Sequence, residues 1–171
     1  MISASVSLDD KAVLGVIDAL PKTVLRAQRS AVSTTTTWAR KRLQSRVIAK
    51  TGIPSRVFRR FRIKSKRKRE TGVVWFGVNP IKAGYVGKVS QDVGGAFAGD
   101  YYFEKGFVAS MRSGHRSIFK RKGKSRLPIV EQVVDIQAGV DLAEEVAREA
   151  QQQLRERFIA KMRELNPHLE R

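Results

Sequence analysis

Two segments of the chain are dense in lysine and arginine, whose cations bind phosphate or carboxylate groups. Residues 40–69 hold fourteen Lys or Arg and no acid before Glu70, and residues 112–126 hold seven and no acid. Because clustered cations release counterions when they bind a nucleic-acid backbone, both segments predict a surface that faces DNA or an acidic neighbouring protein. The predicted contact residues are Arg56, Arg59, Arg60, Arg62, Lys64, Lys66, Arg67, Lys68, Arg69, Arg112, Arg116, Lys120, Arg121, Lys122, Lys124 and Arg126.

A simpler interpretation stays open for each basic segment. In the first, Val57, Phe58, Phe61 and Ile63 are interleaved with cations, as on a solvated face whose apolar partners point inward. In the second, the charges would keep an edge strand from pairing with another chain. Neither segment has the spacing of a helix-turn-helix, of zinc-finger ligands or of RNA-stacking aromatics, so sequence-specific base reading is not expected.

Two short motifs suggest enzymatic chemistry, and each lacks a necessary part. Ser113-Gly114-His115 places a hydroxyl near a base, as in a nucleophilic site. The sequence has no third catalytic member at a suitable spacing, so we predict a turn here. The run KGKS at residues 122–125 is similar to the end of a phosphate-binding loop. Position 118, however, is Ile where that motif requires glycine, which excludes the nucleotide site.

Metal and thiol chemistry have few candidate residues. The chain has no cysteine, which excludes disulfides, thiol nucleophiles and thiolate metal sites. His115 and His168 lie far apart in the sequence, and nothing fixes Asp92 and Asp100 in the geometry that a metal-dependent nuclease needs. We therefore predict no catalytic residue, no metal and no cofactor, and a protein that is not an enzyme.

A cluster of aromatic residues precedes the second basic segment. Phe103 and Phe107 are expected in a core beneath the C-terminal helix. Phe97, Tyr101 and Tyr102 follow or adjoin a glycine-rich stretch that is too flexible to be core alone. We predict that these three residues contact another subunit.

Length and charge set the class of protein. With 171 residues, 42% of them hydrophobic, the chain is predicted to form one domain with a modest core. A net charge of +18 would repel a compact domain unless nucleic acid, an acidic protein or an anionic membrane supplied counter-charge. We expect no transmembrane helix, no secretory signal and no membrane partner, because the C-terminal helix lacks a polar face dominated by lysine and arginine.

Hydrophobic periodicity predicts an α+β fold. An antiparallel β-sheet is expected to be packed by an N-terminal helical segment and a long C-terminal helix. The three expected sections are an N-terminal strand and helices over 1–60, a β-sheet over 61–136 and a C-terminal helix over 138–166. In more detail we expect a strand over 2–8, helices over 9–20, 22–50 and 54–60, and a strand starting at 61. A charged hairpin tip is expected at 64–70, a buried strand over 71–78, and a flexible loop or a broken hairpin arm over 79–100. Strands follow near 101–111, 116–120 and 127–136, with a basic loop over 112–126.

Several short motifs follow a distinctive order: an aromatic strand, a Ser-Gly-His turn, a basic strand and an Arg-Leu-Pro-Ile strand, before a long helix. In this order the chain resembles the minor tail protein Z family, the tail completion proteins of long-tailed bacteriophages. The motif residues are Ala96-Phe97, Phe107-Val108-Ala109-Ser110-Met111, Ser113-Gly114-His115, Ile118-Phe119-Lys120-Arg121, Gly123-Lys124, Arg126-Leu127-Pro128-Ile129 and Glu131.

The resemblance implies a structural virion protein, made in the host bacterial cytoplasm, at the head-proximal end of the tail. It implies an oligomeric ring next to the tail terminator, the head connector and the tail tube, with possible contact to genomic DNA, and it carries over no catalytic residue. The alternative hypothesis is a sequence-nonspecific nucleic-acid-binding protein, which the charge alone would also fit.

Overall fold

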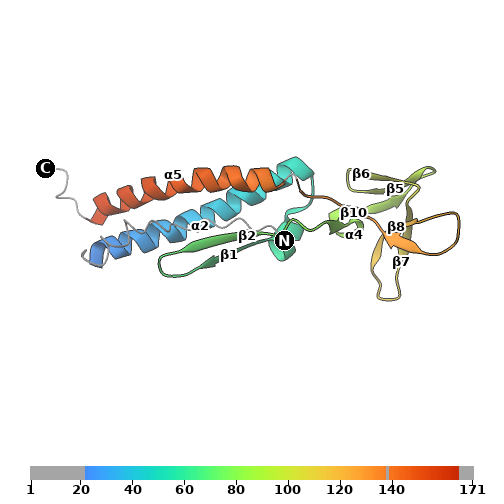
Figure 1. The fold of residues 1–171 in the computed structure, drawn as a ribbon, viewed down its shortest axis with the longest axis horizontal. Coiled ribbons are helices and arrows are strands. Elements are labelled where there is room, and N and C mark those ends of the chain that lie inside the picture. Colours follow the sequence, from blue (N-terminus) through green and yellow to red (C-terminus); the bar gives the residue numbers. More distant parts are fainter. Residues whose placement is uncertain (1–21, 138, 166–171) are drawn as a thin grey trace.

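In the computed structural model the molecule is elongated, and its described residues, 22–137 and 139–165, form two lobes along the long axis (Figure 1). The strand over 2–8 and the helix over 9–20 expected from the sequence lie outside the described residues. The helical lobe comprises α2 (Lys22–Thr51), α3 (Ser55–Val57), the π-helix η1 (Phe58–Arg62), β1 (Ile63–Arg67), β2 (Gly72–Phe76) and α5 (Gly139–Leu165). The β lobe comprises β3 (Ile81–Lys82), α4 (Ala83–Val86), β4 (Val89–Gln91), β5 (Gly95–Ala98), β6 (Tyr101–Glu104), β7 (Phe107–Ser110), β8 (Arg116–Arg121), β9 (Ile129–Glu131) and β10 (Val133–Val134).

Helices α2 and α5 run antiparallel beside one another and form the length of the helical lobe (Figure 1). Both confirm the predicted helices to within one residue at each end. The threonines at 34–37 do not interrupt α2, because three of their hydroxyls donate to carbonyls one turn earlier, as Thr36 Oγ1 does to Val32 at 2.6 Å. Helix α5 buries Ala143, Ala150 and Leu154, as its periodicity predicts.

The β1–β2 hairpin packs against α2 in the register Ile63↔Phe76 to Arg67↔Gly72. Gly72 permits the close approach, because a Cβ at this position would lie 1.8 Å from Thr36 Oγ1. The predicted hairpin tip at 64–70 is wrong in its bounds: strand β1 continues to Arg67, and the turn lies between β1 and β2. Phe61 belongs to η1 and not to the strand.

The β lobe differs most from the expected elements. The predicted long loop over 79–100 instead contains β3, α4, β4 and β5. The single strand expected over 101–111 is two strands, β6 and β7, because the chain turns at Lys105, which has φ 57°, and the Gly106 amide donates to the Phe103 carbonyl. The final expected strand is likewise divided into β9 and β10.

The α+β class with antiparallel strand pairing is confirmed. The strands of the described residues form two two-stranded sheets, β1-β2 and β10-β3, and two three-stranded sheets, β4-β5-β6 and β7-β8-β9. Phe103 and Phe107 lie in the β lobe, away from α5, so their expected position beneath that helix is wrong (Figure 1). Phe103 packs on the main core from the side of the β lobe, while Phe107 faces Phe119 with ring centroids 6.3 Å apart.

One hydrophobic core connects the two lobes. Buried side chains of the helical lobe, such as Phe58 and Phe76, belong to the same cluster as Ile81, Ala96 and Ile118 of the β lobe. Tyr101 adds a polar link, since its hydroxyl donates to the Thr51 carbonyl at the end of α2 at 2.7 Å. The core therefore fixes the basic segments of the two lobes at separate places along the molecule.

Candidate functional site

The first basic segment covers the end of α3, η1 and the β1–β2 hairpin. Arg56, Arg59 and Arg60 are exposed on α3 and η1. Arg62 is half-buried, and its Nη2 donates to the Pro80 carbonyl at 3.1 Å while its Nε has no partner among the described residues. Arg62 therefore ties η1 to the start of the β lobe, whereas the side chains of Arg56 and Arg59 are exposed to solvent.

Strand β1 presents its cations in an ordered row. After Ile63 every residue of the strand is exposed. Lys64 and Lys66 lie on one face because side chains alternate along a strand. Arg67 lies on the opposite face, where its Nη1 donates to Ser33 Oγ on α2 at 2.7 Å. Arg67 thus anchors the hairpin, and Lys64 and Lys66 point into solvent.

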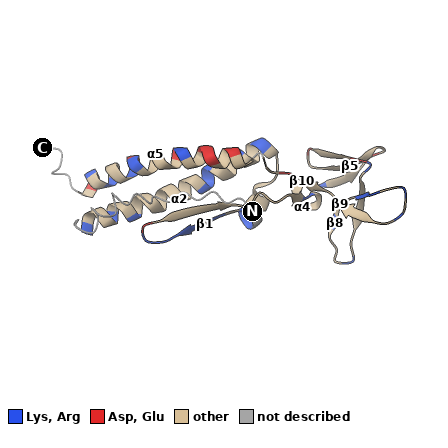
Figure 2. Ribbon diagram, in the orientation of Figure 1, with Lys and Arg blue, Asp and Glu red and all other residues tan. Residues whose placement is uncertain are grey.

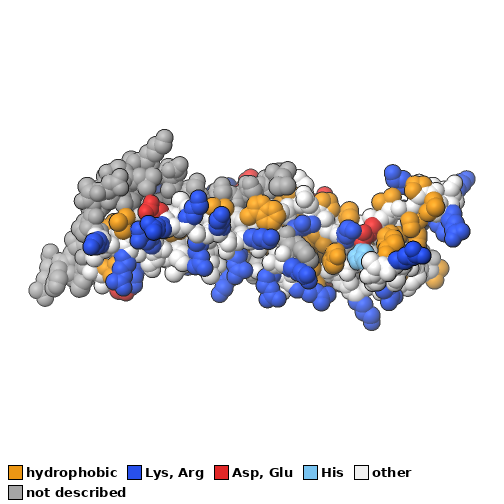
Figure 3. Space-filling view, turned by 90° about the horizontal axis from the view of Figure 1, so that it is seen from below, with side chains coloured by type: hydrophobic (Ala, Val, Ile, Leu, Met, Phe, Trp, Pro, Cys, Tyr) orange, Lys and Arg blue, Asp and Glu red, His pale blue; other side chains and the backbone are white. Residues whose placement is uncertain are grey.

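The tip of this hairpin continues the row with Lys68 and Arg69, both exposed. Among the described residues, no acid lies within ion-pair distance of these two cations or of Lys64 and Lys66. Figure 2 shows the basic hairpin below α2, and Figure 3 shows Lys and Arg side chains gathered along much of the face seen from below. We call Lys64, Lys66, Lys68 and Arg69 the hairpin cations.

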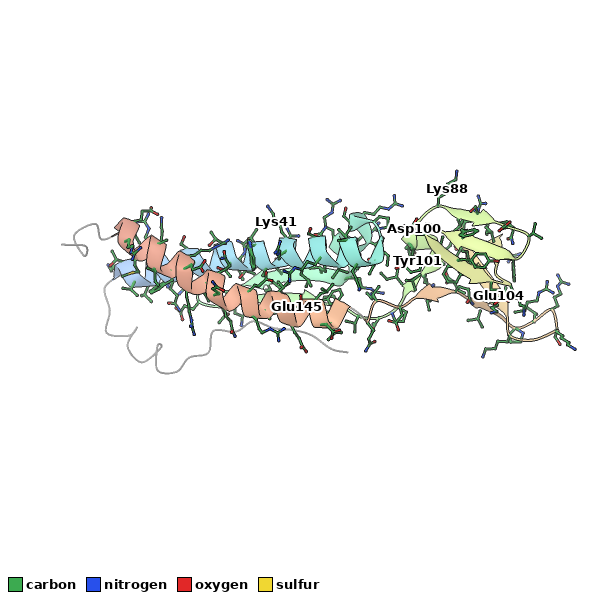
Figure 4. The ribbon with its side chains drawn as sticks, turned by 90° about the horizontal axis from the view of Figure 1, so that it is seen from above. Lys41, Lys88, Asp100, Tyr101, Glu104 and Glu145 are labelled. Atoms are coloured by element: carbon green, nitrogen blue, oxygen red, sulfur yellow. The ribbon has the colours of Figure 1, made fainter. Side chains whose placement is uncertain are left out.

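Helix α2 contributes further cations that were not among the predicted contact residues. Lys41 and Lys50 are exposed, and Figure 4 shows Lys41 on the side of α2 turned away from α5. Arg46, by contrast, bonds Glu145 at 3.2 Å and Glu149 at 2.5 Å on α5. Helix α2 contains no acid, so its excess of positive charge can be predicted from the sequence. The sequence does not show which of its cations form ion pairs with α5.

The second basic segment is divided by the structure. Strand β8 runs through the predicted basic loop, so Arg116, Lys120 and Arg121 are strand residues. The parts outside the strand are the β7–β8 turn with Arg112 and the β8–β9 loop, residues 122–128. The predicted turn at Ser113-Gly114-His115 is confirmed, with Gly114 at φ 79° and its amide donating to the Met111 carbonyl.

The β8–β9 loop is exposed at every residue. It carries Lys122, Lys124 and Arg126 and also Leu127, whose exposed fraction is 68%. Arg121, at the start of the loop, lies over the Phe107 ring with its guanidinium carbon 5.8 Å from the centroid. Figure 1 places this loop at the far end of the β lobe from the β1–β2 hairpin, so the two basic segments do not form one surface.

A carboxylate at the junction of three strands collects several donors. Glu131 lies 2.6 Å from His115 Nε2 and 2.8 Å from Lys82 Nζ, and the Ser117 hydroxyl also hydrogen-bonds to it. Burial raises the pKa of Glu131, but the hydrogen bonds from Lys82, His115 and Ser117 outweigh it, and the net pKa is lowered. The hydrogen bond to Glu131 in turn raises the pKa of Lys82.

This cluster contains a Ser, a His and a Glu, yet its geometry is that of a structural clamp. Ser117 is fully buried and accepts a hydrogen bond from the Gly84 amide at 3.0 Å. The Nε2 atom of His115 bonds Glu131, so it is not available as a base for a serine hydroxyl. The cluster therefore joins β3, β8 and β9, and no local sequence pattern indicates it because its members come from separate segments.

Asp92 and Asp100, the two acids considered for a metal-dependent nuclease, lie at different places in the β lobe. Asp92 Oδ1 accepts the Val93 amide at 2.7 Å in the β4–β5 turn, and Asp100 lies beside Gly52 at the end of α2. Among the described residues, no group of three or more His, Asp or Glu side chains could hold a metal ion.

The three predicted subunit-contact residues separate into two environments. Phe97 and Tyr102 pair across β5 and β6, with ring centroids 4.8 Å apart, and are 37% and 47% exposed. Tyr101 is half-buried next to the end of α2, where burial, and secondarily the charge of Asp100, raises its pKa (Figure 4). The structure thus brings Phe97 and Tyr102 together and places Tyr101 at the contact between the lobes.

Comparison with known proteins gives one result. A family model described as prophage minor tail protein Z matches residues 10–170 of the chain. Neither the search of curated proteins nor the search of solved structures found a match. Within the described ranges, no helix has the length and apolar character needed to cross a membrane.

Proposed function

Because the chain belongs to the prophage minor tail protein Z family, and is thus a structural protein of the phage tail, we propose that it completes the tail at its head-proximal end and joins tail to head. The observation that carries the proposal is the family match over residues 10–170, almost the whole chain. The order of motifs between residues 96 and 131, which lies within the matched range, agrees with it.

In this proposal the protein forms a ring among the tail terminator, the head connector and the tail tube, and its role is structural and not enzymatic. The exposed cations support a position beside DNA or acidic subunits. Residues 22–80 contain seventeen Lys or Arg and a single acid, Glu70. A surface with that imbalance is stabilised by an anionic neighbour, and the genome passing from head to tail supplies phosphates at this place.

Deletion of the gene from an inducible prophage tests the proposal. The expected result is filled heads and tails that fail to join or that join without infectivity, with the titre restored by the wild-type gene supplied in trans. Gold-labelled antibody on complemented particles should lie at the head-proximal end of the tail. Normal infectious particles from the deletion strain, or label at the distal tip, would show that the proposal is wrong.

The hairpin cations also favour a second candidate, a sequence-nonspecific nucleic-acid-binding protein that acts without assembly. Tight duplex binding by the isolated monomer, with a steep dependence on salt, would support this candidate. Weak binding by the monomer together with retention in purified virions would support the tail-completion role. The two outcomes are distinguishable because the first requires no other virion protein.

A further inference from the structure

The two basic segments differ in what accompanies their charges. The hairpin cations have one exposed large hydrophobic residue beside them, Val73, at 36% exposure. The β8–β9 loop combines its cations with Leu127 at 68%, and Val130 follows on β9 at 40%. Protein interfaces are built around desolvated apolar anchors, whereas phosphate contacts need only cations. The composition of the β8–β9 loop therefore fits a protein partner better than DNA.

The same lobe carries an exposed aromatic pair that fits such a loop. Phe97 and Tyr102, the aromatic pair, lie on the outer face of the β4-β5-β6 sheet, and Val93 in the adjoining turn is fully exposed. The opposite face of this sheet buries Ala96 and Ala98 in the core. One face of the sheet is thus buried against the core of its own chain, and the other exposes two aromatic rings to solvent.

The Tyr102 ring packs against its own chain. A Cβ on Gly94 would lie 2.7 Å from the Tyr102 hydroxyl, and one on Gly95 would lie 3.0 Å from it. The two glycines therefore let the Tyr102 ring lie across the end of β5, against Phe97. A ring held in place by its own chain loses little freedom on binding, which is typical of interface anchors.

The charges around the two surfaces are complementary. Residues 88–105 carry three acids, Asp92, Asp100 and Glu104, and two lysines, whereas residues 120–126 carry five cations and no acid. Lys105 lies 3.7 Å from Glu104, but both side chains are at least 70% exposed, so this pair leaves Glu104 accessible to another cation. An approaching β8–β9 loop would thus meet net negative charge in a chain that is otherwise strongly basic.

We propose that the β8–β9 loop of one copy binds the aromatic pair of a second copy, with Leu127 against Phe97 and Tyr102 and the loop cations facing Asp100 and Glu104. The contact joins two different surfaces of the same chain, so it is heterologous and can continue from copy to copy until a ring closes. The inference extends the proposed ring of the tail-completion role by naming its interface. It also assigns the β8–β9 loop to protein and leaves the hairpin cations for DNA.

Two variants that each remove one side of the contact test the proposal. In analytical ultracentrifugation of purified, nucleic-acid-free protein, the wild-type chain should form oligomers of its 19.2 kDa monomer. Leu127→Glu and Tyr102→Glu should each weaken self-association by roughly tenfold or more, because each places a charge at a central anchor. Met111→Glu is the matched control, since Met111 is 39% exposed in the β7–β8 turn and should leave assembly unchanged.

Mixing the two variants gives a result specific to a heterologous contact. The intact loop of Tyr102→Glu can bind the intact aromatic pair of Leu127→Glu, so the equimolar mixture should form dimers although neither variant does alone. Circular dichroism checks that both variants are folded. A wild-type chain that stays monomeric at its highest soluble concentration, or a mixture without dimers, would overturn the proposal.

Failure of this interface and failure of the proposed function are distinguishable. The ultracentrifugation uses the isolated protein, so a gene deletion without phenotype would contradict tail completion and leave the interface untouched. If Leu127→Glu assembled like the wild type while loop substitutions weakened DNA binding, the β8–β9 loop would be a DNA contact and the assignment to protein would be wrong.

Discussion

Glu131 is an ionisable residue that joins three strands of the β lobe. Its carboxylate holds β3, β8 and β9 together through Lys82, His115 and Ser117. Because the folded-state pKa of Glu131 lies below its ordinary value of 4.5, the ionised cluster contributes stability above that pH. The contribution is lost as the pH falls through the lowered pKa. The partner Lys82 has a raised pKa, so it stays charged throughout this acidic range.

The first prediction concerns Glu131→Gln. The substitution keeps the shape but removes the charge, so the free energy of unfolding at pH 7 should fall by about 1–3 kcal/mol. As the pH falls below 4.5 and through the lowered pKa of Glu131, urea unfolding should show a smaller loss of stability in the variant than in the wild type. Glu104→Gln is the control, because Glu104 is 70% exposed and should change neither value. If the free energy of unfolding fell equally with pH in the wild type and in Glu131→Gln, the ionised Glu131 would not stabilise the fold.

The second prediction compares neighbouring buried threonines of α2. Thr35 Oγ1 has no partner among the described residues, whereas Thr36 Oγ1 donates to the Val32 carbonyl at 2.6 Å. Both threonines line a small cavity, of about 30 Å³, between α2, β2 and α5, so the cavity does not distinguish them. Replacing an unsatisfied hydroxyl by a methyl group of the same shape removes a desolvation cost, while replacing a bonded one loses a hydrogen bond.

Thr35→Val should therefore leave stability unchanged or raise it by up to about 1 kcal/mol, and Thr36→Val should lower it by about 1 kcal/mol. Both changes keep the β-branched shape, so helix propensity is nearly constant within the pair. Thermal unfolding followed by circular dichroism measures the difference. Equal effects from the two substitutions would mean that the Thr35 hydroxyl is satisfied in solution.

At the scale of elements, the long helices could be predicted and the short strands could not. Helices α2 and α5 have 30 and 27 residues, so their periodicity accumulates over many turns. Strands β3 and β10 have two residues each, which is too short for any alternation to appear. The break between β6 and β7 depends on a positive φ at Lys105, a residue type that gives no sign of it.

The candidate site follows the same division. The excess of cations in both basic segments can be read from the composition. Because Lys and Arg side chains are rarely buried, their exposure could also be predicted. The separation of Tyr101 from Tyr102 depends on where the end of α2 lies, and the clamp at Glu131 depends on the pairing of β8 with β9. Both are long-range contacts, which local sequence patterns do not encode.

The third prediction concerns the start of α5. A Cβ on Gly139 would lie 2.6 Å from Cζ of Phe76, whose side chain is only 2% exposed and cannot move aside without disturbing the core. Gly139→Ala should therefore destabilise the protein by about 1–3 kcal/mol, although alanine favours a helix. Gly123→Ala is the control, since no atom lies within 4 Å of its added Cβ. Urea unfolding of both variants should separate them, and equal stability would show that α5 can shift away from β2.

At the scale of the whole molecule, the elongated shape holds the two basic segments apart (Figure 1). The β1–β2 hairpin lies under α2 in the helical lobe, and the β8–β9 loop lies at the outer end of the β lobe (Figure 2). Because one core cluster spans both lobes, these positions are fixed relative to one another. The proposed DNA contact and the proposed contact with a neighbouring copy therefore lie on different lobes.

The last prediction compares two triple variants that each remove three positive charges. Lys64→Ala, Lys66→Ala and Lys68→Ala change the hairpin, and Lys122→Ala, Lys124→Ala and Arg126→Ala change the β8–β9 loop. For a short duplex DNA, log K falls with log salt by about 0.9 for each phosphate contact. The hairpin triple should therefore lower this slope by up to about 2.7, and the loop triple should leave the slope near the wild-type value and reduce self-association instead. Fluorescence anisotropy at several salt concentrations, with each variant kept monomeric by dilution, gives the slopes. An equal reduction by both triples would mean that DNA responds to the net charge of the chain and not to the hairpin, because only a local contact can distinguish variants of identical charge.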